Sequence, residues 1–194
     1  FIPADENIQQ HDIPVSHQLG YIGLVIGAAH ATKRLPLDKL KELVTLLDHP
    51  VILLGGPEDR ITGEVLAAID PVKIYNACGK FKLNESADLV RQARIIITHD
   101  TGLMHIAAAF RKPIISVWGN AAPAFGMYPY YGQLQMGVAA PFHMVEVKGL
   151  SCRPCSKIGY EKCPKGHFRC MENISLQDIK QLAQQMLTTR QTGS

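Results

Sequence analysis

Residues 94–118 read RIIITHDTGLMHIAAAFRKPIISVW, two apolar runs separated by a polar turn and an alanine-rich stretch. The first run, RIIIT at 94–98, is typical of a short strand buried on both faces of a parallel sheet. Residues 102–110 predict a helix, and PIISVW at 113–118 predicts the next strand. A strand, a helix and a second strand in this order are the unit from which α/β proteins are built.

The same alternation extends toward the N-terminus. Three further apolar runs predict strands, at residues 21–28, 51–56 and 73–76. Apolar residues at helical spacing between these runs predict helices, at residues 37–47, 58–69 and 86–93. We interpret Asn84 as the residue that caps the last of these helices. Five alternations of strand and helix predict an α/β fold with a doubly wound, Rossmann-like parallel sheet.

The rest of the chain falls outside this alternation. We interpret residues 1–20 as a leader or interdomain linker and residues 21–190 as the α/β domain. Residues 119–174 hold four of the five cysteines and predict a long irregular segment. Ser175, with Asp178 three residues later, predicts the start of a final helix that docks back onto the domain. Because the chain begins with Phe rather than Met, we expect it to be a fragment of a longer chain.

The composition argues against several classes of protein. The chain is 46% hydrophobic and 19% charged with a net charge of +3, which fits one folded globular domain. Lys and Arg are scattered rather than clustered, which argues against a dedicated nucleic-acid surface. No apolar run approaches the ~20 residues of a membrane helix, and FIPADENIQQ at 1–10 lacks the features of a signal peptide. We therefore expect a soluble, cytoplasmic protein.

Ligands of doubly wound sheets bind outside the carboxyl ends of the strands, so the strand-to-helix loops are the places to search. GAAHATKRLP at 27–36 offers small residues and Lys33 as a cation for phosphate, or is a flexible loop with solvated cations. It is neither a GxGxxG fingerprint nor a Walker loop, which argues against hydride transfer and P-loop ATPase activity. GGPEDR at 55–60 places Glu58 and Asp59 where they either stabilise a helix start or accept hydrogen bonds from a ribose.

The turn after residues 94–98 is a third polar loop. Asp100 can orient sugar hydroxyls, and the backbone N–H groups of Thr101 and Gly102 lie at a helix N-terminus that favours an anion. His105, one turn into the helix, can face the same pocket. The alternatives are that Asp100 or Thr101 only caps the helix and that His105 is an ordinary core or surface histidine.

In their order and spacing, GA…TKRLP, GGPED and DTGLMHIAAAFRKPIISVWG resemble the C-terminal, donor-binding half of glycosyltransferase family 9, the lipopolysaccharide heptosyltransferases. The likeness covers about residues 20–190, and D-[TS]-G-x-x-H-x-x-A-A is its specific part. The resemblance implies the two-domain GT-B fold and transfer of a sugar, expected to be heptose, from a nucleotide diphosphate donor such as ADP-heptose. No metal or other cofactor is expected for transfer. The implied donor contacts are Lys33 for the diphosphate, Glu58 or Asp59 for the ribose, Leu83 for the base, and Asp100, Thr101, Gly102 and His105 for the diphosphate and the transferred sugar.

The resemblance also implies partners outside this chain. Members of the family have an N-terminal domain that binds the lipid-linked saccharide acceptor and carries the catalytic base, and nothing before residue 20 matches it. We therefore assign no catalytic residue here, and we expect this chain alone to bind the donor weakly and to transfer nothing. The full protein is expected to work at the inner face of the bacterial inner membrane, with peripheral association.

One short segment has the ligand types of a structural zinc site, namely Cys152, Cys155, Cys163 and Cys170, with His167 nearby. The spacing is irregular for a zinc ribbon, so free thiols in a loop are the alternative. We expect the fifth cysteine, Cys78, to be ordinary core packing.

Two other functions stay open at this point. A non-catalytic nucleotide-binding module would use the same crevice and would differ only in lacking the acceptor domain. A zinc-knuckle nucleic-acid binder would use residues 148–172, where basic residues interleave with the cysteines. The second function leaves the α/β half unexplained, and we expect no nucleic-acid partner.

Overall fold

The computed structural model describes residues 2–132 and 142–189, and its centre is a parallel sheet. Within that part of the chain the strand order is β3-β2-β1-β4-β5-β6. The strands are β1 (Ile22–Val25), β2 (Val51–Leu54), β3 (Ile74–Asn76), β4 (Ile95–Thr98), β5 (Ile114–Trp118) and β6 (Phe142–Glu146). The order reverses direction between β1 and β4, so this is a doubly wound sheet, as the sequence predicts.

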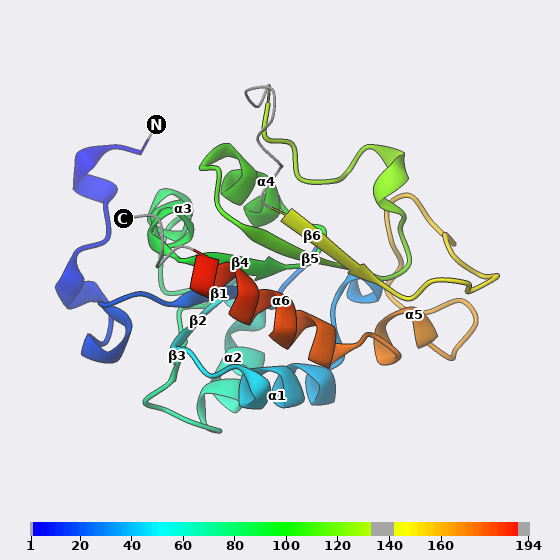
Figure 1. The fold of residues 1–194 in the computed structure, drawn as a ribbon, viewed down its shortest axis with the longest axis horizontal. Helices are drawn as coiled ribbons and strands as arrows, with labels where there is room; N and C mark the ends of the chain where they lie inside the picture. The colour runs from blue at the N-terminus through cyan, green and yellow to red at the C-terminus, as the bar shows by residue number, and fades with distance from the viewer. Residues whose placement is uncertain (1, 133–141, 190–194) are drawn as a thin grey trace.

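Helices cover both faces of the sheet (Figure 1). On one face lie α1 (Leu37–Leu46), α2 (Arg60–Ala67) and α6 (Leu176–Thr189), and on the other lie α3 (Leu83–Gln92) and α4 (Gly102–Ala109). The isoleucines of β4 show why such a strand is apolar throughout. Ile95 and Ile97 pack into the core beneath α1 and α6, whereas Ile96 packs into the core beneath α3 and α4. Each such burial contributes about 1.5–3 kcal/mol relative to exposure.

The start of α3 differs from the prediction. The helix begins at Leu83 rather than at Ser86, and Asn84 lies inside its first turn, so the expectation that Asn84 caps it is wrong. Glu85 supplies the capping contact instead, because its carboxylate accepts a hydrogen bond of 2.6 Å from the Lys82 N–H. Asn84 donates to the Glu6 carboxylate.

The prediction of an irregular segment over residues 119–174 is also wrong in part. The segment contains β6, which pairs with β5 in parallel, and the short helix α5 (Arg169–Glu172). Residues 133–141 of this segment lie outside the described residues. The final helix is confirmed, because Ser175 Oγ accepts the Asp178 N–H at 3.2 Å and the apolar face of α6 is buried against α1 and the sheet.

Residues 2–20 pack against the domain through short 3-10 turns. Ile8 and Ile13 are buried in the core beneath α3, and the Ile8 N–H donates to Asp88 Oδ2 at 2.8 Å. The ring of His17 lies within hydrogen-bond distance of two backbone carbonyls, that of Val51 in β2 and that of Lys73, just before β3. No helix in the described part of the chain is long and apolar enough to cross a membrane.

Candidate functional site

A pocket of about 580 Å³ opens at the carboxyl ends of β1 and β2, beside the reversal of strand order between β1 and β4. Four loops and the first turns of α3 and α4 form its walls. The lining residues are Val25, Gly27, Ala28, Ala29, Gly55, Gly56, Pro57, Glu58, Asp59, Gly79, Phe81, Leu83, Ser86, Thr101, Gly102, Leu103 and Ile106. This is where doubly wound proteins bind ligands, and the volume suits a nucleotide-sized molecule.

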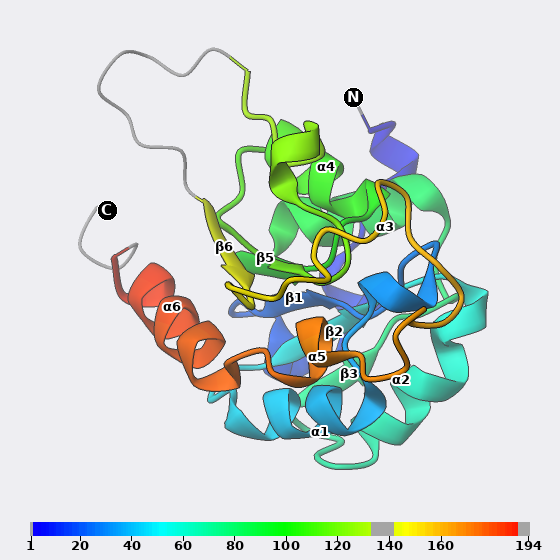
Figure 2. The same cartoon turned by 90° about the vertical axis from the view of Figure 1, so that its right-hand side faces the viewer.

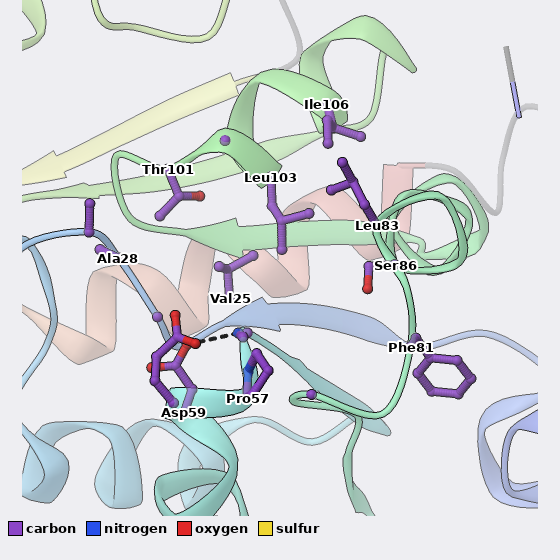
Figure 3. Close-up of a pocket in the computed structure, with 17 residues that line it drawn as sticks. Val25, Ala28, Pro57, Asp59, Phe81, Leu83, Ser86, Thr101, Leu103 and Ile106 are labelled. Carbon is purple, nitrogen blue, oxygen red and sulfur yellow. Dashed lines mark hydrogen bonds between the residues drawn. The ribbon is translucent and has the colours of Figure 1, made fainter.

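The pocket has two chemically different ends (Figure 3). Ala28, Asp59 and Thr101 lie at one end, beside the loops after β1, β2 and β4. Phe81 and Leu83 lie at the other end, where α3 begins. Leu83, which the family resemblance implies as a contact for the base, is 71% exposed, and three apolar residues that the sequence did not point to, Phe81, Leu103 and Ile106, also line the pocket.

Asp59 is 4% exposed and joins the loops that follow β1 and β2. Its Oδ2 accepts the Gly56 N–H at 3.0 Å, and its Oδ1 lies 3.4 Å from Arg34 Nη1. Burial raises the pKa of this carboxyl, and the Gly56 N–H and the Arg34 guanidinium oppose that rise. A Cβ on Gly27 would lie 2.0 Å from Asp59 Oδ2, and one on Gly55 would lie 2.6 Å from it. Both glycines are therefore needed for the carboxylate to fit, and Asp59 holds the wall of the pocket.

Glu58 occupies a different position from its neighbour. It lines the pocket and is exposed. The sequence names Glu58 and Asp59 as equal candidates for a ribose contact, whereas in the structure the side chain of Glu58 is the more accessible of the two.

Lys33 and Asp100 form an ion pair at the carboxyl end of β4, although 67 residues separate them in the chain. Lys33 Nζ lies 2.7 Å from Asp100 Oδ2, and the two side chains are only 13% and 9% exposed. The next residue, Thr101, caps α4, because its Oγ1 accepts the Met104 N–H at 3.3 Å. The N-terminus of α4, with Thr101 and Gly102, faces the pocket. The structure thus brings Lys33 and Asp100 together beside the start of α4, where Thr101 and Gly102 line the pocket, whereas Lys33 and Asp100 are not among the described residues that line it.

His105 lies one turn into α4 and is exposed, and it is not among the described residues that line the pocket. Its neighbours Leu103 and Ile106 face the pocket instead. The geometry of this chain therefore places His105 beside the site rather than within its walls.

A second histidine, His99, was not singled out from the sequence and is 1% exposed. Its Nε2 accepts the Leu35 N–H at 3.0 Å, which ties the end of the loop after β1 to β4. Burial lowers the pKa of His99 to about 4, with the Gly27 carbonyl opposing this shift and Arg34 adding to it. His99 is therefore neutral at pH 7, and it carries a positioning contact rather than a charge.

Residues 148–172, called the cysteine-rich segment below, hold four free cysteines, of which Cys152, Cys155 and Cys163 are partly buried and Cys170 is buried. Cys152 Sγ is 3.7 Å from His167 Nε2. Burial raises the pKa of Cys155, and negative charges on Cys163 and Cys152 add smaller rises. Burial alone would raise the pKa of Cys163, but hydrogen bonds from the backbone N–H groups of residues 165–168 lower it. Among the described residues, no group of three or more His, Cys, Asp or Glu side chains is arranged to hold a metal ion. Cys78 is buried in the core, as expected, and burial raises its pKa to about 12.

Solved structures with the same fold are sugar-transferring enzymes. The ADP-heptose lipopolysaccharide heptosyltransferase II of E. coli superposes with a TM-score of 0.72 and 20% identity, over 94% of this chain and 50% of that one. The E. coli heptosyltransferase WaaC with ADP superposes with a TM-score of 0.62 and 21% identity, over 91% of this chain and 47% of that one. In sequence, the lipooligosaccharide heptosyltransferase 2 of Haemophilus influenzae is 33% identical over 107 residues, which are 53% of this chain and 31% of the relative.

The fold and the position of the pocket define a Rossmann-like α/β domain of the kind found in GT-B glycosyltransferases. The chain spans about a third of the length of the curated relatives that it matches. The model of glycosyltransferase family 9 (heptosyltransferase) matches residues 3–151, and the chain belongs to this family.

Proposed function

We propose that this chain is the donor-binding domain of a glycosyltransferase that moves a heptose from an ADP-heptose-like donor to a lipopolysaccharide core or a related glycan. The observation that carries the proposal is the two-ended pocket at the strand-order reversal. One end has the N-terminus of α4, with the Lys33–Asp100 ion pair next to it at Asp100 and outside the pocket lining, and the other end offers an apolar surface. A nucleoside diphosphate has the matching division between a charged diphosphate and a flat base.

The diphosphate is proposed to lie at the N-terminus of α4. Thr101 and Gly102 line the pocket at the start of α4, where the backbone N–H groups carry the partial positive charge of a helix start. Lys33 adds a full positive charge beside them, held within 2.7 Å of Asp100. As the bond to the sugar breaks, negative charge develops on the leaving diphosphate, and these preorganised groups stabilise it. We assign no metal or cofactor to this step.

Glu58 is proposed to accept hydrogen bonds from the ribose, because it is exposed and lines the pocket while Asp59 is already engaged by Gly56 and Arg34. Phe81 and Leu83 are proposed to line the slot for the base. Asp100 and His105 are proposed to meet the transferred sugar on the side of the pocket that faces the acceptor.

The acceptor side of the reaction is also part of the proposal. The catalytic base and the binding site for a lipid-linked saccharide are assigned to a second domain, since about two thirds of each curated relative lies outside the matched region. We also propose that the full protein acts in the cytoplasm and associates peripherally with the inner membrane.

For the cysteine-rich segment, we propose one structural zinc ion bound by Cys152, Cys155, Cys163 and Cys170. Four thiols within 19 residues are a suitable donor set for a tetrahedral site, and Cys152 Sγ lies 3.7 Å from His167 Nε2. Binding the ion requires these side chains to rearrange, because among the described residues no three or more such ligands are arranged around one point. Elemental analysis for zinc and iron tests this, and metal at well below one ion per chain contradicts it.

Calorimetric titration of the chain with ADP, UDP and GDP tests the donor site. We expect one of these nucleotides to bind and Lys33→Ala to weaken that binding. Lys180→Ala is the matched control, since Lys180 on α6 pairs at 3.4 Å with Asp48, which follows α1, and neither residue lines the pocket. Failure of all three nucleotides to bind, in a chain that is folded by circular dichroism, contradicts the proposed donor site. A transfer assay on the longer protein separates an enzyme from a non-catalytic nucleotide-binding module.

A further inference from the structure

The cysteine-rich segment lies against the loop that carries Lys33, although more than 120 residues separate the two in the chain. In Figure 2 the orange segment passes beside the blue loop that follows β1. Three hydrogen bonds join Thr32 to Tyr160. The Thr32 N–H and Oγ1 donate to the Tyr160 carbonyl at 3.1 and 3.0 Å, and Thr32 Oγ1 accepts the Tyr160 N–H at 2.8 Å. We call this set of bonds the Thr32 clasp.

The clasp is enclosed by closely packed neighbours. Thr32 is 2% exposed. On one side, a Cβ on Gly119 at the end of β5 would lie 2.9 Å from the Thr32 carbonyl oxygen. On the other, a Cβ on Gly159 would lie 2.6 Å from the Cβ of His30. The loop therefore has little room to shift while the clasp is intact.

The far side of the clasp is itself anchored to the domain. The hydroxyl of Tyr160 donates to the Cys155 carbonyl at 3.0 Å, and the Cys155 N–H donates to the carbonyl of Asn120, just after β5, at 3.0 Å. Cys170, at the end of the segment, is buried in the core beneath α1 and α6. Tyr160 is thus held at both ends and provides a fixed point for Thr32.

We propose that Thr32 is a positioning residue through which the cysteine-rich segment fixes Lys33 for the donor diphosphate. Lys33 follows Thr32 directly, so the clasp fixes its backbone while Asp100 fixes its ammonium group at 2.7 Å. Two fixed points leave the lysine little conformational entropy to lose when a diphosphate binds. This inference rests on the proposed function only in taking the diphosphate as the group that Lys33 meets.

Three variants test the inference, with ADP as the probe. Thr32→Val removes the hydroxyl at nearly constant volume and leaves the Tyr160 N–H without its acceptor. Thr32→Ser keeps the hydroxyl. Thr45→Val is the matched control, because Thr45 is an exposed threonine on α1 whose Oγ1 donates to the Lys41 carbonyl at 2.8 Å. We expect Thr32→Val to weaken ADP binding roughly tenfold, and the other two variants to bind ADP as the unchanged chain does.

A merely structural defect is separated from positioning by a double-mutant cycle. If Thr32 acts through Lys33, Thr32→Val adds nothing to the loss that Lys33→Ala already causes. Equal losses in both backgrounds overturn the inference, and so does a Thr32→Val chain that binds ADP normally. Circular dichroism melting checks that each variant is folded.

Amide hydrogen exchange of residues 30–36, measured without nucleotide, distinguishes this inference from the proposed function. We expect faster exchange there in Thr32→Val than in Thr45→Val, with normal exchange in Thr32→Ser. If no variant and not even the unchanged chain binds a nucleoside diphosphate, the proposed function fails. In that case, if Thr32→Val leaves the amide exchange of residues 30–36 unchanged, the clasp does not hold this loop and the inference fails as well. Faster exchange of these residues supports the clasp.

Discussion

Replacing Lys33 by Met removes the ammonium group and keeps most of the buried stem, so it tests the charge separately from the packing. The ion pair of Lys33 with Asp100 spans 2.7 Å, and at an effective dielectric constant of about 20 its gross attraction is about 6 kcal/mol. The cost of desolvating both groups offsets most of that energy. Since the side chains are 13% and 9% exposed, the net loss lies between that of exposed and fully buried pairs, at about 2 kcal/mol. We expect the midpoint of thermal unfolding to fall by about 4–8 °C.

The same substitution should weaken ADP binding by about 10- to 100-fold, because a charge-assisted hydrogen bond to phosphate contributes about 1.5–3 kcal/mol. The double variant Lys33→Met/Asp100→Asn separates the two effects. Without Lys33, Asp100 is a partly buried carboxylate with no cation, and Asn removes that cost, so we expect stability to recover while ADP affinity stays low. Calorimetry and thermal unfolding on the same preparations measure both. Recovery of ADP affinity together with stability would refute the assignment of Lys33 to the diphosphate.

Three further outcomes follow from the site. Glu58→Gln should weaken ADP binding severalfold without changing the melting temperature. Asp59→Asn should lower the melting temperature, because Asp59 is buried and joins two loops. If Glu58→Gln lowers only the melting temperature and Asp59→Asn weakens only ADP binding, Glu58 is not the ribose contact. The pKa of His99 is about 4 in the folded chain, compared with an ordinary value of 6.5. Because the unfolded chain binds a proton that the folded chain does not, the free energy of unfolding should fall by about 3 kcal/mol as the pH drops from 6.5 to 4. Denaturant titrations of His99→Gln should show a smaller fall over the same range. Gly159→Ala should weaken ADP binding, because its Cβ would lie 2.6 Å from His30. Gly166 also has a positive φ but has open space around it, so Gly166→Ala should lower stability without changing ADP affinity. Equal ADP affinities in the two variants would argue against the clasp.

The central strands could be predicted from the sequence because they are buried on both faces. β4 is the example, with three consecutive isoleucines that divide between the two cores. β6 could not be predicted, because it is the last strand of the described sheet and only Val145 of its five residues is buried. An edge strand of this kind has no continuous apolar run, and its pairing with β5 is visible only in three dimensions. The start of α3 was missed for a related reason: a Glu85 carboxylate that folds back onto the Lys82 N–H looks like any other charged residue in a sequence.

The candidate site divides in the same way. Polar residues in a loop that follows a buried strand can be recognised from the neighbouring sequence alone, so Lys33, Asp100 and Thr101 could be predicted as site residues. Which carboxylates are already engaged is not a local property. Asp59 fits its place only because Gly27 and Gly55 lack a Cβ, and Gly27 lies on the loop that follows a different strand. The preference for Glu58 over Asp59 therefore required the structure.

The charges of the site bear on how it would recognise a diphosphate. Arg34 is held by Asp59 and by the Ala28 carbonyl, and Lys33 is held by Asp100, so neither cation is unpaired. Asp59, Asp100 and Glu58 are three carboxylates against these two cations. The site therefore has no net positive charge, and its overall charge does not explain how it would bind an anion. What the site offers instead is orientation: the amides at the start of α4 and a lysine fixed at its backbone and at its ammonium group. Such a site binds a ligand whose phosphates reach these groups more tightly than it binds an unrelated anion. A site for a nucleotide-sugar donor requires this selectivity, whereas a surface that binds nucleic acid through its charge does not.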